Sequence, residues 1–477
     1  MPSLPATYYR PELHVTAETG VLEAPAAILL DSSTWHLFYQ YRPDPQSPSR
    51  WGHQISRGDA YSWDQCDDAL APQGAEERVR AGSVAAIDGG VNLYFTSVTP
   101  TGTEIHLARI DDLEACCSDI SDDPLSLCPA VQRVGRVVGD TDGLYNFRSP
   151  CVVADWVAND DRSEGHEGWL MLAVTGDVDS PDLAMLHSDD GKEWQLHGPL
   201  RFEGDTGLEP QASIVSPRIT RLRDEVTGHI RDILLITVER NGVDISGYVV
   251  GHLEGPTFTV VSPFTRIDYG HDFTRPRNTT FTPGTIPEEQ RYDRAAIMGL
   301  LNGIGRLDDP TTHPSLDTEE WANAVSLPRV TTLQDGVLYQ TPTSKLPDHV
   351  GRTQRAHLWT GLCDIPQGGQ VLVKLLDASG ATAATICHTG DELTIDRSMN
   401  PHHRGDAPAR APLADGDSDS LTIIADGSTL EVFADGGLVA MASRVYVDGG
   451  CHGFDVTATG GAELINSFER WNGGLAG

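Results

Sequence analysis

The stretch GVLEAPAAILLDSSTWHLFYQY, residues Gly20–Tyr41, decides the fold class of this chain. An apolar run at Ala26–Leu30 precedes a polar turn at Asp31–Thr34, and large apolar residues then alternate with other side chains over Trp35–Tyr41. A turn between two such runs is typical of a β-hairpin. Because aromatic and large apolar side chains favour strands, the stretch predicts the first sheet of an all-β domain.

The composition supports this class. A chain of 477 residues fits about two or three domains, or one large repeat domain with a second unit. The 48 glycines and 30 prolines are frequent enough to separate many short elements. Apolar residues at helical spacing do not continue beyond about two turns, so strands are expected throughout.

The charge limits the possible partners. The chain carries 69 acidic and 34 basic residues, a formal charge of -35, which repels nucleic-acid backbones and anionic membranes. A neutral ligand is therefore expected, with no nucleic-acid or membrane partner. The start, MPSLPATYYRPELHV, has no basic segment followed by an apolar core, and no long apolar stretch follows. We therefore expect a cytoplasmic protein without a secretion signal or membrane span.

The cysteines and histidines indicate neither a metal nor a cofactor. The eight cysteines, including the neighbours Cys116 and Cys117, form no CxxC pair and have no histidine at metal-ligand spacing. Free thiols are expected rather than disulfides or a zinc site. The pair His402 and His403 in NPHHRGD is typical of a loop. We find no glycine-rich phosphate loop or dinucleotide fingerprint, and expect no cofactor and no metal.

Two imperfect copies of one pattern point to repeated small sheets. In RWGHQISRGDAYSWDQC and AMLHSDDGKEWQLHG, a strand ends in serine, an Asp/Gly turn follows, and a tryptophan comes next. This arrangement suits the meander of a β-propeller blade. The matching residues are Ser56, Asp59 and Trp63 in the first copy and Ser188, Asp190 and Trp194 in the second.

Further strands and one boundary follow from turn-separated runs. The charged or proline-containing segments Asp111–Pro129 and Pro283–Arg294 are expected to be surface loops or short helices outside the core. The pattern changes over Ser326–Pro342, which places a domain boundary near Lys345, with a propeller at 1–345 and a β-sandwich at 346–477. The expected strands are 91–98, 169–174, 233–238, 248–253, 296–301, 357–364, 370–375 and 384–388.

An ordered set of motifs resembles glycoside hydrolase family 32, the β-fructosidases. The matching stretches, which span nearly the whole chain, are WHLFYQYRP, RWGHQIS, AGSV, NFRSP, DYGHDF, SLPRV and LEVFADGGLVAMASRVY. The resemblance implies a five-bladed propeller followed by a β-sandwich. It also implies fructoside hydrolysis by a nucleophilic carboxylate and an acid/base carboxylate, with a third carboxylate that stabilises the transition state.

The positions that should hold these carboxylates are substituted. The WMNDPNG motif of the family falls on Val21–Ala27, which puts Ala24 at the nucleophile position. The RDP motif falls within NFRSP, where Ser149 replaces the aspartate. In SIVSPRITRL, the acid/base position is Val215, and the rival placement is Glu209 in GLEPQAS. The resemblance therefore predicts no catalytic residue at the three aligned positions.

Part of the sugar-binding set remains. Two sugar-binding tryptophans that the resemblance leads us to expect are replaced by Val21 and Leu300. Other residues match pocket positions, although packing or other ion pairs would explain each of them equally well. The matching residues are Gln40, Trp51, Arg148 and Asp272.

Three functions follow from these substitutions. General acid/base assistance is worth about 10² to 10⁴-fold, and loss of the nucleophile removes the covalent route. The first hypothesis is a pseudoenzyme that binds a fructoside or other glycan, or acts as a regulatory partner. The second is an active glycoside hydrolase with carboxylates from unaligned positions such as Glu23 and Glu209. The third is an interaction scaffold. Further candidates for a displaced carboxylate pair, together with Glu23, are Glu18, Asp142 and Glu239.

Overall fold

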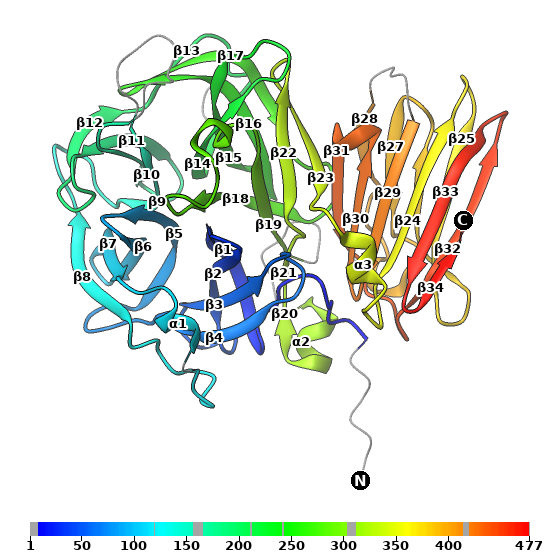
Figure 1. The fold of residues 1–477 in the computed structure, drawn as a ribbon, viewed down its shortest axis with the longest axis horizontal. Coiled ribbons are helices and arrows are strands. Elements are labelled where there is room, and N and C mark those ends of the chain that lie inside the picture. Colours follow the sequence, from blue (N-terminus) through cyan, green and yellow to red (C-terminus); the bar gives the residue numbers. More distant parts are fainter. Residues whose placement is uncertain are drawn as a thin grey trace.

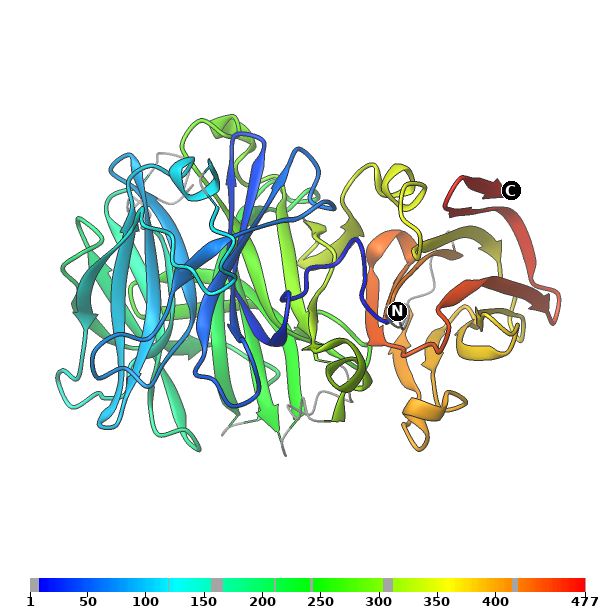
Figure 2. The same ribbon diagram turned by 90° about the horizontal axis from the view of Figure 1, so that it is seen from below.

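The computed structural model describes residues 8–118, 120–155, 166–209, 212–240, 243–302, 312–413 and 419–476. A propeller of small sheets surrounds a common centre, and a two-sheet sandwich lies beside it (Figure 1). The view from below shows the sandwich packed against one side of the propeller (Figure 2). None of the helices in these ranges is long and apolar enough to cross a membrane.

The predicted hairpin forms the inner half of the first blade. It consists of β1 (Gly20–Asp31) and β2 (Thr34–Arg42), followed by β3 (Arg50–Arg57) and β4 (Asp64–Leu70) in one antiparallel meander. The first strand begins six residues before the predicted run at Ala26, because two irregularities in the β1–β2 ladder let the LEAP segment stay paired with β2.

Four further blades follow in chain order. The first strand of each blade is innermost, and each innermost strand contacts the next one around the axis. The pairing of β1 with β18 in parallel closes the ring. The strands are β5 (Arg78–Ile87), β6 (Gly90–Thr99), β7 (Gly102–Ile110) and β8 (Val131–Val138); β9 (Arg148–Ala154), β10 (Trp169–Gly176), β11 (Pro181–Ser188) and β12 (Gln195–Pro199); β14 (Ser213–Arg223), β15 (Ile230–Arg240), β16 (Val243–Glu254) and β17 (Thr257–Arg266), with β13 (Arg201–Glu203) at the edge; and β18 (Phe273–Phe281), β19 (Ala295–Leu301), β22 (Arg329–Gln334) and β23 (Val337–Pro342).

Short elements lie in the connections within the second and fifth blades. The helices are α1 (Ala115–Ser118) and α2 (Pro314–Glu319), and the short strands are β20 (Trp321–Ala322) and β21 (Ala324–Val325). The strand β20 pairs with β1, and β21 pairs with β19. These contacts attach the segment after β19 to the closure of the ring.

The repeated serine pattern marks equivalent places in two blades. Ser56 is the penultimate residue of β3 and Ser188 is the last residue of β11; these are the third strands of the first and third blades. The Ser56 hydroxyl donates to the Asp59 carbonyl at 2.5 Å, and the Ser188 hydroxyl donates to Asp190 Oδ1 at 3.2 Å. Each serine closes the turn that leads to the outermost strand, as the pattern predicts.

One predicted surface segment is partly core. Residues 111–129, called the insertion below, join β7 to β8 and contain α1. Its Cys116, Cys117 and Cys128 are buried and pack with Cys66 of β4. The prediction that this segment lies outside the core is wrong, because thiols bury like small apolar groups despite the charged residues around them. The segment Pro283–Arg294 contains a 3-10 turn at Glu288–Gln290.

The sandwich consists of two facing sheets, and the three strands expected in it are present. The elements from the connector onward are α3 (Leu346–Val350), β24 (His357–Asp364), β25 (Gln370–Asp377), β26 (Thr382–His388), β27 (Glu392–Asp396), β28 (Ala409–Pro412), β29 (Asp419–Asp426), β30 (Thr429–Ala434), β31 (Val439–Arg444), β32 (Cys451–Thr459), β33 (Glu463–Trp471) and β34 (Gly474–Ala476). Lys345 lies in the segment between the last propeller strand, β23, and α3.

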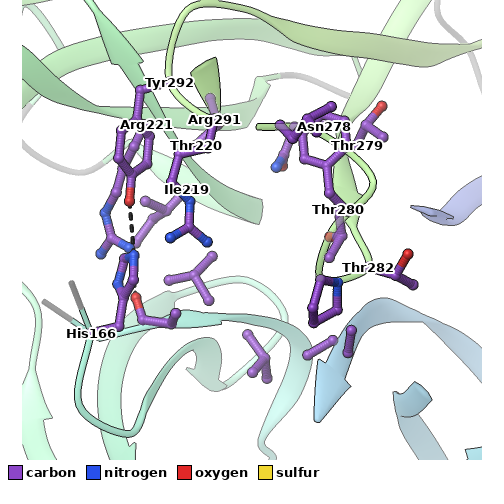
Figure 3. A pocket seen from close by; sticks show the side chains of 18 of the residues that line it. His166, Ile219, Thr220, Arg221, Asn278, Thr279, Thr280, Thr282, Arg291 and Tyr292 are labelled. Atoms are coloured by element: carbon purple, nitrogen blue, oxygen red, sulfur yellow. Dashed lines mark hydrogen bonds between the residues drawn. The ribbon is translucent and has the colours of Figure 1, made fainter. Parts of the chain in front are cut away.

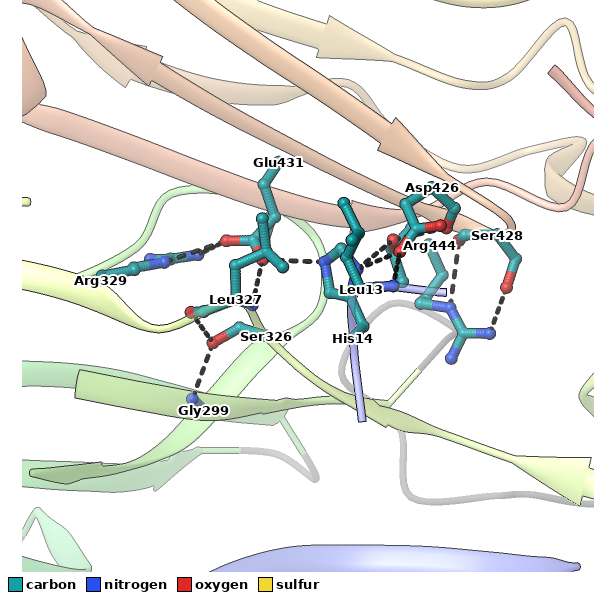
Figure 4. Close-up of polar contacts among 12 residues, drawn as sticks. Leu13, His14, Gly299, Ser326, Leu327, Arg329, Asp426, Ser428, Glu431 and Arg444 are labelled. Atoms are coloured by element: carbon teal, nitrogen blue, oxygen red, sulfur yellow. Dashed lines mark hydrogen bonds and ion pairs between the residues drawn. The ribbon is translucent and has the colours of Figure 1, made fainter. Parts of the chain in front are cut away.

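Buried charges join the two domains. The Glu431 carboxylate of β30 accepts hydrogen bonds from Arg329 Nη2 at 2.7 Å and from the Leu327 amide at 2.7 Å (Figure 4). His14 Nε2 lies 3.1 Å from the same carboxylate, and its Nδ1 lies 2.8 Å from Asp426. One sandwich glutamate thus holds the N-terminal segment and the last propeller blade together.

Candidate functional site

The candidate site lies on the propeller axis, at the end where the innermost strands begin; this end is called the mouth below. The three positions that the sequence alignment predicts for the family carboxylates all lie there: Ala24 in β1, Ser149 in β9 and Val215 in β14. Ala24 is 4% exposed and packs in the core between the first two blades, while Ser149 and Val215 are half-buried. No carboxylate is present at any of the three positions.

A repeated irregularity shapes the mouth. Register shifts interrupt β5 between Arg80 and Ser83, β14 between Val215 and Arg218, and β18 between Thr274 and Arg277. Non-glycine residues near the same level adopt positive φ angles: 53° at Ser149, 54° at Ser216 and 51° at Arg275. Such backbone is costly for residues with a side chain and is found most often at functional sites.

Two arginines, called the axial arginines below, cross the axis at this level. Arg218 donates from Nη2 to the Gly82 carbonyl at 2.5 Å and from Nη1 to the Ser149 carbonyl at 3.4 Å. Arg277 donates from Nε to the Ala26 carbonyl at 3.3 Å and from Nη1 to the Ser216 hydroxyl at 2.9 Å. Together they connect the innermost strands of all five blades.

The axial arginines carry buried positive charge. Both side chains are fully buried, and neither forms an ion pair with a carboxylate in the part of the chain that the structure describes. Burial lowers the pKa of Arg218 to about 10, and burial together with the nearby Arg218 charge places the pKa of Arg277 well below its ordinary value. Since arginine stays protonated in proteins, two cations lie on the axis at the level of Gly82 and Ser149.

Three further arginines surround the mouth. Arg80 is half-buried, and burial and the neighbouring Arg78 charge lower its pKa. Arg148 donates to the Gly176 carbonyl at 2.7 Å; burial and the Arg80 charge lower its pKa. Arg275 pairs with Asp244 at 3.1 Å. Although the protein is acidic as a whole, its axis is therefore locally positive.

The carboxylate nearest the mouth is held in a network. Glu23 accepts hydrogen bonds from Gln40 Nε2 at 2.6 Å and from the Ser49 hydroxyl at 2.5 Å, and pairs with Arg42 Nε at 2.9 Å. The Gln40 oxygen accepts from the Ala81 amide at 2.7 Å. The structure thus joins the predicted residues Glu23 and Gln40. Glu209 is exposed in the segment before β14.

Two predicted binding residues lie elsewhere. Trp51 is 0% exposed, stacks among Phe38 and Phe95, and donates from its indole to the Arg80 carbonyl at 3.0 Å. The prediction of a sugar contact is wrong, because core packing covers the ring. Asp272 is also 0% exposed, and pairs with Arg397 of the sandwich at 2.6 Å. It belongs to the domain interface and cannot reach a ligand at the mouth.

A cavity of about 430 Å³ opens at the other end of the axis (Figure 3). Its wall includes Thr279 and Thr280 of β18 and Arg221 of β14. His166 Nε2 lies 2.8 Å from the Tyr292 hydroxyl. Burial and the Arg221 charge lower the pKa of His166 to about 4, so the ring is neutral at pH 7. Sequence patterns did not indicate this cavity, because its walls come from separate blades.

The adjacent histidines occupy a loop, as their pattern predicts. His402 and His403 lie in a 3-10 turn. His402 Nε2 lies 2.9 Å from Asp448 Oδ1, whereas the His403 ring stacks on Tyr446. The two rings therefore contact different neighbours and do not converge on one site.

Comparisons with known proteins agree on one family. The models "Glycosyl hydrolases family 32 N-terminal domain" and "Glycosyl hydrolases family 32 C terminal" match residues 14–342 and 365–472. A sucrose-6-phosphate hydrolase of Zymomonas mobilis is 25% identical over 97% of this chain and 91% of its own length. That of Bacillus subtilis is 24% identical, over 96% and 93%.

Solved structures share the fold. The sucrose-6-phosphate hydrolase from Lactobacillus gasseri superposes with a TM-score of 0.72 at 18% identity, over 98% of this chain and 94% of that one. The fructan 1-exohydrolase IIa from Cichorium intybus gives 0.73 at 15% identity, over 97% of each chain. Both support the propeller and sandwich architecture.

Proposed function

Because the chain belongs to glycosyl hydrolase family 32, we propose that it is a non-hydrolytic member that binds a glycan at the mouth of the propeller. The observation that carries the proposal is the replacement of all three carboxylates by Ala24, Ser149 and Val215. With neither nucleophile nor acid/base at these positions, the double-displacement route of the family has no reacting groups.

The axial arginines support the same proposal by electrostatics. Glycoside hydrolysis passes through an oxocarbenium-like transition state, in which positive charge develops on the sugar ring. Arg218 and Arg277 place fixed positive charge at the level of Ala26, Gly82 and Ser149, in a poorly solvated site. Like charges repel strongly where water is excluded, so this environment opposes the reaction.

The same charge suggests the class of ligand. A fructoside or related glycan that carries a carboxylate, sulfate or phosphate group would be attracted to Arg80, Arg148 and the arginines behind them. Gln40 and Ser149 supply neutral polar groups for sugar hydroxyls. We therefore propose an anionic glycan as the ligand.

A hydrolysis screen tests the loss of activity. Wild-type protein is compared with the variant Ala24→Asp, Ser149→Asp, Val215→Glu and with the matched amide variant Ala24→Asn, Ser149→Asn, Val215→Gln, on sucrose, sucrose 6-phosphate, inulin and levan. We expect fructose release from the acid variant alone. Wild-type turnover at an ordinary enzymatic rate of about 1 s⁻¹ or more would overturn the proposal.

The second candidate function is hydrolysis through Glu23. Its carboxylate lies one residue from the nucleophile position and contacts Gln40, which favours it over the other unaligned acids. If wild-type protein is active, the variants Glu23→Gln and Glu209→Gln show which of the two carboxylates the activity requires. Loss of activity in either variant, with retention in an exposed control such as Glu463→Gln, would establish this alternative.

A further inference from the structure

Four potential metal ligands converge on one face of the first blade. In the β2–β3 ladder Phe38 lies opposite His53, and in the β3–β4 ladder His53 lies opposite Cys66. Since side chains alternate along a strand, His36, two residues before Phe38, lies on the same face as His53 and Cys66. The short helix α1 of the insertion brings Cys117 to this face.

Three of the four ligand atoms are close enough to share one ion, and the fourth, the Cys66 sulfur, contacts the Cys117 thiol. The ring nitrogens of His36 and His53 and the Cys117 sulfur all lie within 4.8 Å of one another. His36 Nδ1 and His53 Nε2 are 3.0 Å apart. A tetrahedral zinc site, with bonds of about 2.0 to 2.3 Å, separates its ligand atoms by about 3.3 to 3.8 Å. Small side-chain shifts would therefore be enough for His36, His53 and Cys117 to bind one ion, and Cys66 would complete the set by moving toward the histidines.

All four side chains are shielded from water. Their residues are 2% exposed at His36, 1% at His53, 3% at Cys66 and 8% at Cys117. Structural zinc sites are closed in this way, with four protein ligands and no open position. Two neutral imidazoles and two thiolates also balance the charge of Zn²⁺, so the occupied site would add no net charge to the core.

Metal binding requires neutral imidazoles and deprotonated thiols. Zinc would therefore displace the protons of the Cys66 and Cys117 thiols when it binds.

We propose that His36, His53, Cys66 and Cys117 form a structural zinc site that fastens the insertion onto the first blade. The insertion belongs to the second blade, because it joins β7 to β8. Its Ser126 and Cys128 already share backbone hydrogen bonds of 2.9 Å with Asp68 of β4. Zinc would add a second attachment, at Cys66 of β4, and join two neighbouring blades.

Two other cysteines of the cluster pair with each other. The Cys116 and Cys128 sulfurs lie 2.9 Å apart and so contact each other. The variant Cys128→Ser is therefore a nearby control that should keep the metal. The variant Cys363→Ser, which replaces a buried cysteine in the sandwich, is a second control far from the proposed site.

The test uses the full chain, purified reduced and without chelators. Elemental analysis should find about one zinc per chain, and Co²⁺ should give the near-ultraviolet thiolate-to-cobalt band expected of a tetrahedral site with cysteine ligands. Removal of zinc by a chelator should lower the melting temperature. We expect Cys117→Ser and His53→Gln to lower the metal affinity at least about ten-fold. The variants Cys128→Ser and Cys363→Ser should bind as the wild type does.

Two results would overturn the proposal. The first is wild-type protein that contains almost no zinc and gives no thiolate band with equimolar Co²⁺, a measurement that needs no variant to fold. The second is a Cys117→Ser protein that retains full affinity for Co²⁺. Loss of binding in Cys128→Ser with retention in Cys117→Ser would contradict the ligand assignment.

Discussion

The sharpest quantitative prediction concerns Glu431, the sandwich residue that joins the two domains. Glu431→Gln keeps the size of the side chain and removes its charge. Arg329 then retains Asp268 at 2.9 Å, and His14 retains Asp426 at 2.8 Å, but both lose their shared partner. A fully buried cation that loses a carboxylate is left partly uncompensated, which destabilises the folded state.

The magnitude follows from the pKa of the carboxyl group. Burial raises this pKa, but Arg329 and His14 outweigh burial and lower it from 4.5 to about 2. Since one pKa unit corresponds to about 1.4 kcal/mol, the charged form of Glu431 contributes about 3 kcal/mol to the free energy of unfolding. Loss of one partner of a buried ion pair costs a similar amount, about 3 to 5 kcal/mol.

The sign of the pH dependence is also determined. A carboxyl group whose pKa is lowered by folding stabilises the protein fully above its unfolded pKa, and this stability disappears as the pH falls through the folded value. Glutamine does not titrate. The difference in unfolding free energy between wild type and Glu431→Gln should therefore be about 3 kcal/mol at pH 7, and should shrink between about pH 5 and pH 2.

Denaturant unfolding, followed by tryptophan fluorescence, measures this difference at pH 7 and at pH 3.5. The exposed Glu463→Gln on β33 is the control, and should change stability by less than about 0.5 kcal/mol. A loss below about 1 kcal/mol at pH 7 would refute the reasoning, because a charge compensated in this way should cost more to remove. A difference that stays equal at both pH values would also contradict it.

Three other predictions concern the interface and the mouth. Asp272→Asn should lower the free energy of unfolding at neutral pH by about 2 kcal/mol, because the Arg397 charge outweighs burial and holds the pKa of Asp272 at about 2; an unchanged denaturation midpoint would count against this ion pair. Gly270→Ala should lower the melting temperature and speed proteolysis of the connector, since the added Cβ would lie 2.1 Å from the Ala442 carbonyl oxygen; wild-type protease resistance would contradict the close approach. Arg80→Gln should weaken binding of an anionic glycan about ten-fold in calorimetry and leave a neutral fructoside unaffected; equal losses for both ligands would argue against charge recognition.

Local patterns predicted most strands because the signal for a strand is local. The predicted runs around Trp169 and His357 lie within β10 and β24, and the repeated Ser56 and Ser188 close equivalent turns. Alternation and turn residues act within a few positions, so they can be recognised without tertiary contacts. The start of β1 was less predictable, because bulges in its pairing with β2 disturb the alternation.

Burial of individual side chains was harder to predict. Trp51 and Asp272 carry side chains that suit a sugar site, yet one packs in the core and the other pairs with Arg397. Nothing near either residue in the sequence reveals these partners. The buried cysteines of the insertion were missed for the same reason, since the β4 surface that covers them is formed by another part of the chain.

The sequence by itself determined the all-β class and the series of blades, because each of these follows from patterns within short segments. Only the tertiary structure decided the charge of the axis and the meeting of His36, His53, Cys66 and Cys117. Closure of the ring brings together strands far apart in the chain, and folding of the insertion onto β4 adds Cys117. A positive mouth can therefore exist in a strongly acidic protein, because local potential depends on which side chains meet and not on their total number.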